Sequence, residues 1–221
     1  MKTIKSRLIQ LSIVAILVVS VVGLVAAPDA VPRKAPAWLR NAVVYELYPR
    51  VFSAEGDFNG VTARLEELKD LGVDVIWLMP IHPIGEQKKK GSIGSPYCVR
   101  DYYAINPSYG TTNDFKKLVD AAHQRGMKIL LDLVAGHTAW DSVMMANPDF
   151  YKKDADGKIV SPRPEWADVA ALNYDNPKLR RYMIDMMKFW VKEFGVDGFR
   201  CDVAYTVPVD FWEAARVELE Q

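Results

Sequence analysis

The sequence predicts an α/β fold built on parallel strands. Three observations predict it: apolar runs of strand length, amphipathic runs of helix length between them, and a glycine after each helical run. The strand runs are rich in Val, Ile, Leu and aromatic residues without alternating polar positions, which is typical of strands buried on both faces. We expect strands over residues 42–48, 73–79, 127–133 and 196–202.

The helical runs separate these strands and carry their own boundary signals. We expect helices over residues 61–71, 113–125 and 177–194. Asn176 and Pro177 supply an N-cap and a first-turn proline for the third of them. A glycine follows each helix, where a helix end favours a left-handed residue, at Gly72, Gly126 and Gly195.

Strands that alternate with helices predict either a doubly wound sheet or a β/α barrel. The first strand leads into Tyr48, Pro49 and Arg50 rather than into a glycine-rich phosphate loop, which disfavours a nucleotide-binding sheet. Residues 136–176 form a connection too long for a plain loop. We expect this segment to fold over the strand ends, because long connections of this kind are often functional.

The composition excludes several classes of protein. Half of the 221 residues are apolar, which is typical of a packed domain, and Lys plus Arg equal Asp plus Glu at 28 each. No overall positive field attracts nucleic acid, so we expect no nucleic-acid partner. The short run Lys88, Lys89 and Lys90 is expected to be a solvated loop.

The N-terminal residues differ from the rest. Basic residues precede an apolar run that ends near Ala27, which predicts an export signal over residues 1–27 and a periplasmic or extracellular protein. An uncleaved membrane anchor is the alternative, because the apolar run approaches transmembrane length. Residues 28–40 are expected to form a linker, and residues 41–221 the folded domain.

Two cysteines, Cys98 and Cys201, are too few for a disulfide-scaffolded module. We expect two free thiols, with a disulfide as the alternative, since sequence alone does not show whether they approach each other.

The end of the fourth expected strand carries an Arg and an Asp two positions apart, Arg200 and Asp202. Alternation along a strand places both side chains on one side and Cys201 on the other. A carboxylate beside a guanidinium stays ionised and oriented, as a carboxylate nucleophile must be. An ordinary ion pair at a strand end explains the same pattern.

Five segments in a fixed order resemble the α-amylase family, glycoside hydrolase family 13. They are VYELYPRVF (residues 44–52), VIWLMP (75–80), SPYCVRDYYAINPSYGT (95–111), DLVAGH (132–137) and GFRCDVA (198–204). The resemblance covers nearly all of the chain after the linker. It implies the first half of a (β/α)8 TIM barrel, four β/α units, with residues 136–176 as the insertion after strand three.

The resemblance also implies roles for five residues. Asp202 is implied as the nucleophile that forms a covalent glycosyl-enzyme intermediate, with Arg200 as its partner. Tyr97 is implied to stack on the sugar, His137 to bind its hydroxyls, and Asp132 to order the pocket floor. These residue types suit a sugar, which presents apolar ring faces and hydroxyl edges.

The activity implied is that of a retaining glycoside hydrolase acting on α-glucosidic bonds of starch-like glucans or maltooligosaccharides. Transglycosylation is open, because Tyr205 and Thr206 stand where typical α-amylases carry a Lys-His pair for the acceptor sugar. A membrane-anchored, non-catalytic assembly protein is the alternative from another class. Membrane contact is expected only if residues 1–27 stay uncleaved.

The chain also departs from the family pattern. The family's acid/base Glu on strand five and its second Asp on strand seven have no counterpart here, so we expect a truncated chain without activity. Calcium is doubtful, and no other cofactor or metal is expected: Gly136 stands where many relatives have an Asn ligand, and Ala171 where they have an Asp. Asp168 is the remaining candidate ligand for a cation that wants six to eight oxygens.

Overall fold

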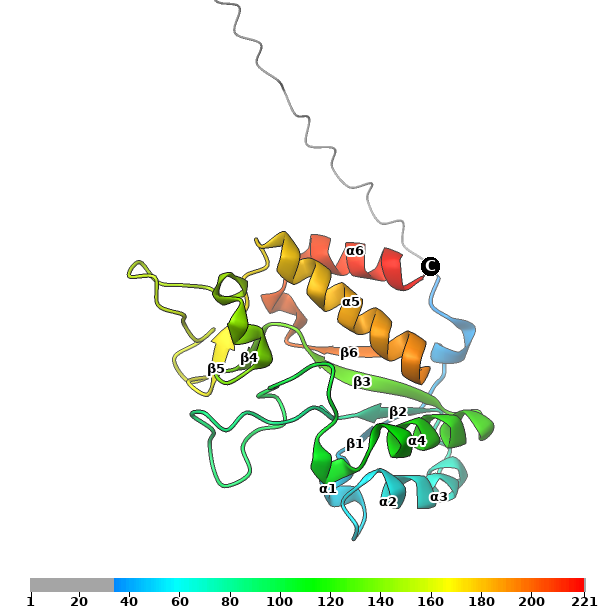
Figure 1. The fold of residues 1–221 in the computed structure, drawn as a ribbon. Helices are drawn as coiled ribbons and strands as arrows, with labels where there is room; N and C mark the ends of the chain where they lie inside the picture. Colours follow the sequence, from blue (N-terminus) through cyan, green and yellow to red (C-terminus); the bar gives the residue numbers. More distant parts are fainter. Residues whose placement is uncertain (1–33, 221) are drawn as a thin grey trace, which may run out of the picture. The chain divides into compact units, whose positions relative to one another are not determined.

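The computed structural model describes residues 34–220. Its main sheet has four parallel strands in the order β1-β2-β3-β6, so neighbours in space follow each other along the chain, as in a barrel (Figure 1). The strands are β1 (Val44–Leu47), β2 (Val75–Leu78), β3 (Lys128–Val134) and β6 (Gly198–Asp202). They lie within the four predicted runs, apart from the last residue of β3.

Helices connect these strands. They are α1 (Pro49–Phe52), α2 (Phe58–Ala63), α3 (Leu65–Asp70), α4 (Thr112–Gln124), α5 (Pro177–Phe194) and α6 (Val209–Leu219). The predicted boundary signals act as expected: the Asn176 side chain accepts from the Lys178 N–H, and Gly195 adopts a left-handed conformation (φ 74°). A Thr111–Asp114 capping box starts α4.

One expected helix, residues 61–71, is wrong in detail. The structure has two short helices that meet at Arg64, whose backbone leaves the helical region (φ −105°, ψ 10°). The Arg64 guanidinium donates to the Phe52 carbonyl at 2.5 Å and lies over the Phe52 ring. The helix is therefore interrupted at Arg64, where the side chain contacts Phe52, twelve residues earlier in the chain.

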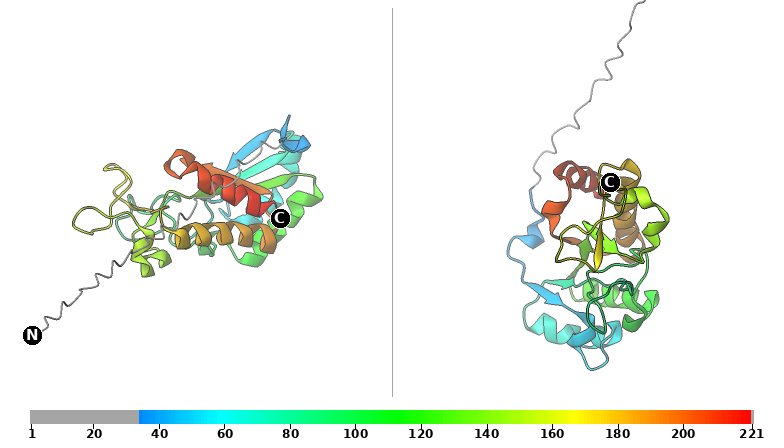
Figure 2. Two further views of the ribbon diagram at one scale, coloured as in Figure 1. Left: turned by 90° about the horizontal axis from the view of Figure 1, so that it is seen from above. Right: turned by 90° about the vertical axis from the view of Figure 1, so that its left-hand side faces the viewer.

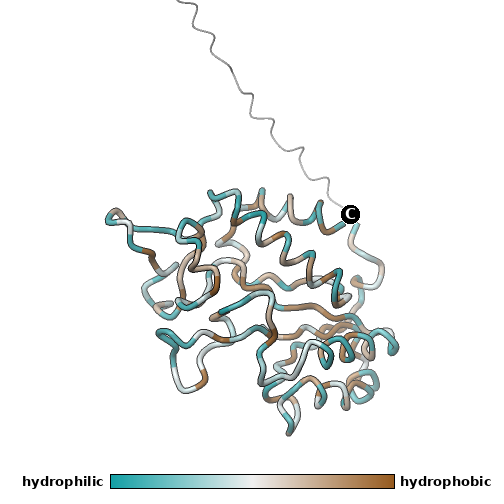
Figure 3. Tube along the Cα trace, viewed as in Figure 1, coloured by the Kyte–Doolittle hydropathy of each residue, from teal (hydrophilic) through white to brown (hydrophobic). Residues whose placement is uncertain are grey.

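The core lies between the sheet and its helices. Apolar residues concentrate along the central strands (Figure 3), and β2 and β3 are largely buried. Between α4 and α5, Trp190 stacks on Phe194 at 4.8 Å and meets the edge of Phe115 at 5.7 Å. Its indole donates to the Tyr102 carbonyl at 2.8 Å, so the helix layer is joined to the loop after β2.

Two long segments extend from the end of the sheet where the strands finish (Figures 1 and 2). One joins β2 to α4. The other, residues 136–176, joins β3 to α5 and contains the antiparallel pair β4 (His137–Ala139) and β5 (Val169–Ala171). Residues of both segments line a cavity next to Asp202.

Some expectations fall outside or at the margin of the described region. Residues 1–27 lie outside it, and within the expected linker Ala37–Leu39 form a single 3-10 turn. Between residues 34 and 220, no helix has the length and apolar character needed to cross a bilayer.

Candidate active site

The register between β3 and β6 brings three charged residues together. Asp132 pairs with Arg200 in this parallel ladder, and Val134 pairs with Asp202. Paired residues of neighbouring strands point to the same side of the sheet, and so do residues two apart on one strand. Asp132, Arg200 and Asp202 therefore project to one side, at the strand ends where both candidate folds place their sites.

Arg200 links the two carboxylates. Its Nη1 donates to Asp202 Oδ1 at 2.7 Å and lies 3.1 Å from both oxygens of Asp132. Partial burial lowers the pKa of Arg200, but Asp132 and Asp202 outweigh it and raise that pKa overall. A permanent cation thus fixes the orientation of the Asp202 carboxylate.

Asp132 is the buried anchor of this network. Its Oδ2 also accepts hydrogen bonds from Trp77 Nε1 and from the Tyr97 hydroxyl, each at 3.1 Å. Burial raises the pKa of Asp132, whereas Arg200, Trp77 and Tyr97 act in the opposite direction. Trp77 also belongs to this network: its indole binds Asp132, and its ring lies 4.5 Å beneath the Arg200 guanidinium.

A cavity of about 330 Å³ opens beside Asp202, and Tyr97 and His137 line it as well. Arg200 and Asp132 do not line the cavity, but each binds a residue that does: Arg200 binds Asp202, and Asp132 binds Tyr97. The structure therefore brings together all five residues that the sequence singled out. The complete lining consists of Lys90, Ser95, Tyr97, Cys98, His137, Trp166, Asp168, Val169, Asp202 and Val203.

His137 is suited to bind a neutral hydroxyl group. The residue is 6% exposed, and its ring lies 5.7 Å from that of Trp166. Burial lowers the pKa of His137, although Asp202 and Asp168 oppose this, so the ring is neutral at neutral pH. Its buried Nδ1 has no hydrogen-bond partner among the described residues. A buried nitrogen without a partner is costly to the folded state.

Two buried tyrosines hold the turn that carries His137. The Tyr102 hydroxyl lies 2.5 Å from the Val134 carbonyl oxygen and 2.8 Å from that of His137, and the Tyr174 hydroxyl donates to the Ala135 carbonyl at 2.8 Å. The sequence alone does not predict this role of Tyr102. Its aromatic type predicts burial, but no local signal shows which carbonyl groups its hydroxyl meets.

A second cluster joins the two long segments across the cavity. Lys90 Nζ lies 2.9 Å from Asp168 Oδ1 and donates to the Glu165 carbonyl at 2.7 Å, and Cys98 Sγ lies 3.2 Å from Asp168 Oδ2. Burial would raise the pKa of Asp168, but Lys90 and Cys98 outweigh it and lower that pKa. The lysine run is a largely exposed loop, as expected, and Lys90 in addition ties these two segments together.

The other two lysines of the run are also engaged. Lys88 Nζ lies 3.5 Å above the Trp140 ring, and Lys89 pairs with Glu86. Each of the three lysines of the run thus has a partner within the protein.

Both cysteines are free thiols, as expected. Burial, with a smaller contribution from Asp168, raises the pKa of Cys98 to about 12, and burial raises that of Cys201 to about 11. Cys201 lies on the other side of β6 from the cavity, beside Trp212 and Leu219. Neither thiol forms a thiolate nucleophile at neutral pH.

The donor set does not fit calcium at the position where many family members bind it. A Cβ at Gly136 would lie 2.4 Å from Thr206 Oγ1, so no ligand side chain fits there. Ala171 pairs with His137 in the β4–β5 ladder and offers no side-chain oxygen. The Asp168 carboxylate is occupied by the Lys90 ammonium and the Cys98 thiol.

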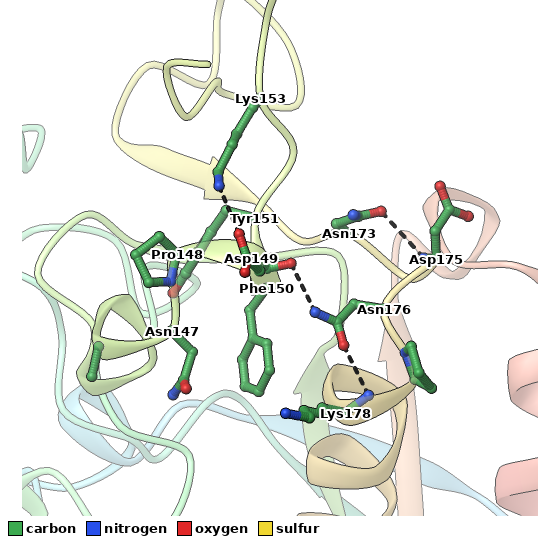
Figure 4. Close-up of a pocket in the computed structure, with 12 residues that line it drawn as sticks. Asn147, Pro148, Asp149, Phe150, Tyr151, Lys153, Asn173, Asp175, Asn176 and Lys178 are labelled. Carbon is green, nitrogen blue, oxygen red and sulfur yellow. Dashed lines mark hydrogen bonds and ion pairs between the residues drawn. The ribbon is translucent and has the colours of Figure 1, made fainter.

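A larger cavity, of about 730 Å³, lies elsewhere, between residues 146–153 of the insertion and the start of α5 (Figure 4). Two of its polar side chains are paired within it: Lys153 pairs with Asp149 at 2.8 Å, and Asn176 donates to the Asp149 carbonyl at 3.0 Å. None of the five candidate residues lines it. Size alone therefore does not mark the site.

Comparison with known proteins agrees with this geometry. The family profile described as "Alpha amylase, catalytic domain" matches residues 30–158 and 163–218. The α-amylase MalA of Haloarcula japonica is 37% identical over 195 residues, which cover 82% of this chain and 28% of the relative. The trehalose-6-phosphate hydrolase of Bacillus subtilis is 36% identical, and the match covers 78% of this chain and 36% of the relative.

A solved structure shows the same partial match. The α-amylase from Lactobacillus plantarum superposes with a TM-score of 0.79 at 48% identity, over 82% of this chain and 43% of that one. The chain thus spans about a third of the length of the curated relatives and less than half of the solved enzyme. The prediction of four β/α units from a larger barrel is confirmed. With its strand order, its clustered Asp202, Arg200 and Asp132 and these matches, the chain belongs to the α-amylase family, glycoside hydrolase family 13.

Proposed function

We propose that the chain supplies the nucleophile half of a retaining active site that cleaves α-glucosidic bonds in starch-like glucans or maltooligosaccharides. The observation that carries this is the bond between Arg200 and Asp202 at the edge of a cavity that His137 and Tyr97 also line. In this mechanism Asp202 attacks the anomeric carbon while the glycosidic C–O bond breaks and the leaving oxygen takes a proton from a second carboxyl group. Water then hydrolyses the resulting glycosyl ester. His137 and Tyr97 hold the sugar being attacked.

The choice of bond is part of the proposal. The relatives include an α-amylase and a trehalose-6-phosphate hydrolase, which share attack at an α-glucosidic carbon. Tyr97, His137 and Trp166 line the cavity, and aromatic and neutral polar side chains suit the ring faces and hydroxyl groups of a neutral glucan. This favours a neutral glucan as the substrate.

We further propose that residues 1–221 alone turn over no substrate. The retaining mechanism needs a second carboxyl group as acid and base. Among residues 34–220, the carboxylates closely associated with the cavity besides Asp202 are Asp132 and Asp168, and contacts with Arg200, Trp77, Tyr97, Lys90 and Cys98 occupy both. Neither is free to protonate a leaving group.

The test of function uses a completed barrel, in which this chain is joined to the remaining strands and helices of an α-amylase catalytic domain, its own or those of the Lactobacillus plantarum relative. Asp202→Asn should lower kcat/KM on maltooligosaccharides by about 10³-fold or more, because the amide cannot form the glycosyl ester. Asp210→Asn is the matched control, since Asp210 pairs with Arg180 on the surface. Full activity of Asp202→Asn would refute the proposal.

We also propose that the protein is exported, on the basis of the basic and apolar N-terminal residues. N-terminal sequencing of the protein isolated from culture medium or periplasm should begin near Pro28. Recovery of the whole protein in the cytoplasm with Met1 retained would contradict export.

A further inference from the structure

Gly136 precedes His137, and the space beside it is taken by another segment. An ideal Cβ at this position would lie 2.4 Å from Thr206 Oγ1 and 3.4 Å from Thr206 Cβ. Gly136 does not have the positive φ that favours glycine at other positions of this chain. Its lack of a side chain therefore serves close packing.

Thr206 closes the turn that follows Asp202. Its hydroxyl donates to the Val203 carbonyl at 2.8 Å, and its backbone N–H donates to the same oxygen at 2.9 Å. Val203 has φ 39° and ψ 45°, a left-handed conformation that is strained for a β-branched residue. Such strain persists only where surrounding contacts enforce it, and two donors on one carbonyl do so.

Both partners of this contact are next to residues of the cavity. Val203 lines the cavity directly after Asp202, and His137 lines it directly after Gly136. The Gly136 side is fixed, because its carbonyl accepts from the Leu172 N–H at 3.1 Å and Tyr174 holds the preceding carbonyl. A displacement at the contact therefore moves the Val203 turn rather than the His137 turn.

We propose that Gly136 and Thr206 are positioning residues, whose close contact sets the placement of Asp202 relative to His137. This rests on the proposed function, since it assigns the contact to the geometry of glycosyl transfer. A methyl group at residue 136 would press on Thr206 Oγ1 and push the turn from Val203 to Thr206, and Asp202 beside it, away from His137.

The experiment is a double-mutant cycle in the completed barrel, with a 4-nitrophenyl maltooligosaccharide as the substrate. Gly136→Ala should lower kcat by at least about tenfold with a smaller change in KM, because misplacement costs the chemical step more than binding. Thr206→Ala should keep at least a third of kcat, since the backbone N–H still holds Val203. Adding Thr206→Ala to Gly136→Ala should restore kcat to that of Thr206→Ala alone.

Two controls separate placement from folding. Thr206→Val keeps an atom at the Oγ1 position, so Gly136→Ala should stay impaired in combination with it. Gly60→Ala creates a comparable clash with Ser53 Oγ, at 1.9 Å, on α2 and outside the cavity. It should lower the melting temperature and leave kcat of the folded enzyme unchanged.

Three results would overturn the inference alone: unchanged kcat in Gly136→Ala, no recovery in the double variant, or a loss of activity that follows loss of folded protein, as in Gly60→Ala. A completed barrel that hydrolyses no α-glucan before any substitution would instead refute the proposed function, and the positioning role with it.

Discussion

At the scale of single residues, the site depends on how completely each polar group is satisfied. Asp132 accepts from three side chains, so it orients Arg200 and Tyr97 rather than reacting itself. Asp202 accepts from Arg200 through Oδ1 and keeps one edge on the cavity. The difference in bonding between these two carboxylates gives them different roles.

The Tyr102 hydroxyl gives a test at this scale. Tyr102→Phe should lower the free energy of unfolding of the completed barrel by about 1–3 kcal/mol, because the buried Val134 and His137 carbonyls lose their shared donor. Tyr103→Phe, at a half-buried ring that packs on Phe189, is the control and should change it by less than about 0.5 kcal/mol. Urea denaturation measures both, and equal effects would contradict the assigned hydrogen bonds.

At the scale of elements, the loop after β2 is joined to the helix layer at His82. Its Nδ1 lies 3.0 Å from the Ala104 carbonyl oxygen, and its ring meets the edges of Tyr102 and Trp190. Burial lowers the pKa of His82 to about 4. The neutral ring is therefore part of the packing between β2 and α5.

This burial gives the stability a dependence on pH. The pKa of His82 is lower in the folded state than its unfolded value near 6.5, so its contribution to stability is fully present above pH 6.5. As the pH falls from 6.5 toward 4, the unfolded chain binds a proton at His82 that the folded chain does not, and this contribution is lost. Between those pH values, His82 lowers the free energy of unfolding by about 3 kcal/mol. His82→Gln should flatten the pH dependence of the urea midpoint between pH 7 and 4, and an unchanged slope would contradict this account.

How far the sequence predicts these elements depends on whether their signals are local. The strands, the Asn176 cap and the Gly195 helix end follow from neighbouring residues and were found within a few positions. The break at Arg64 and the Lys90–Asp168 contact depend on residues 12 and 78 positions away, for which no local pattern exists. The five site residues were recognisable because they lie in family motifs, whereas Trp77, Trp166 and Thr206 gained their roles only in three dimensions.

At the scale of the whole molecule, the sheet has two outer strands. In the described part of the chain, β1 and β6 each pair on one side only. Val43 and Val44 are 51% and 47% exposed at the β1 edge, and β6 is only partly buried along its length. Unpaired apolar strand edges favour association with other chains.

We therefore expect residues 1–221, produced alone at micromolar concentration, to form aggregates that sediment, whereas the completed barrel stays monomeric because its outer strands are paired. Analytical ultracentrifugation distinguishes the two. A monomeric 221-residue chain that melts cooperatively would show that these edges are protected without further strands.

The central claim, that Asp202 is the nucleophile, is tested most directly by trapping the glycosyl-enzyme. The completed barrel would be incubated with 5-fluoro-α-glucosyl fluoride, which slows hydrolysis of the intermediate, and digested with trypsin. The peptide from Cys201 to Arg216 should gain one fluoroglucosyl group, and fragmentation should place it on Asp202. An active barrel that yields no adduct, or one labelled on Asp132, Asp168 or any other residue, would contradict the account.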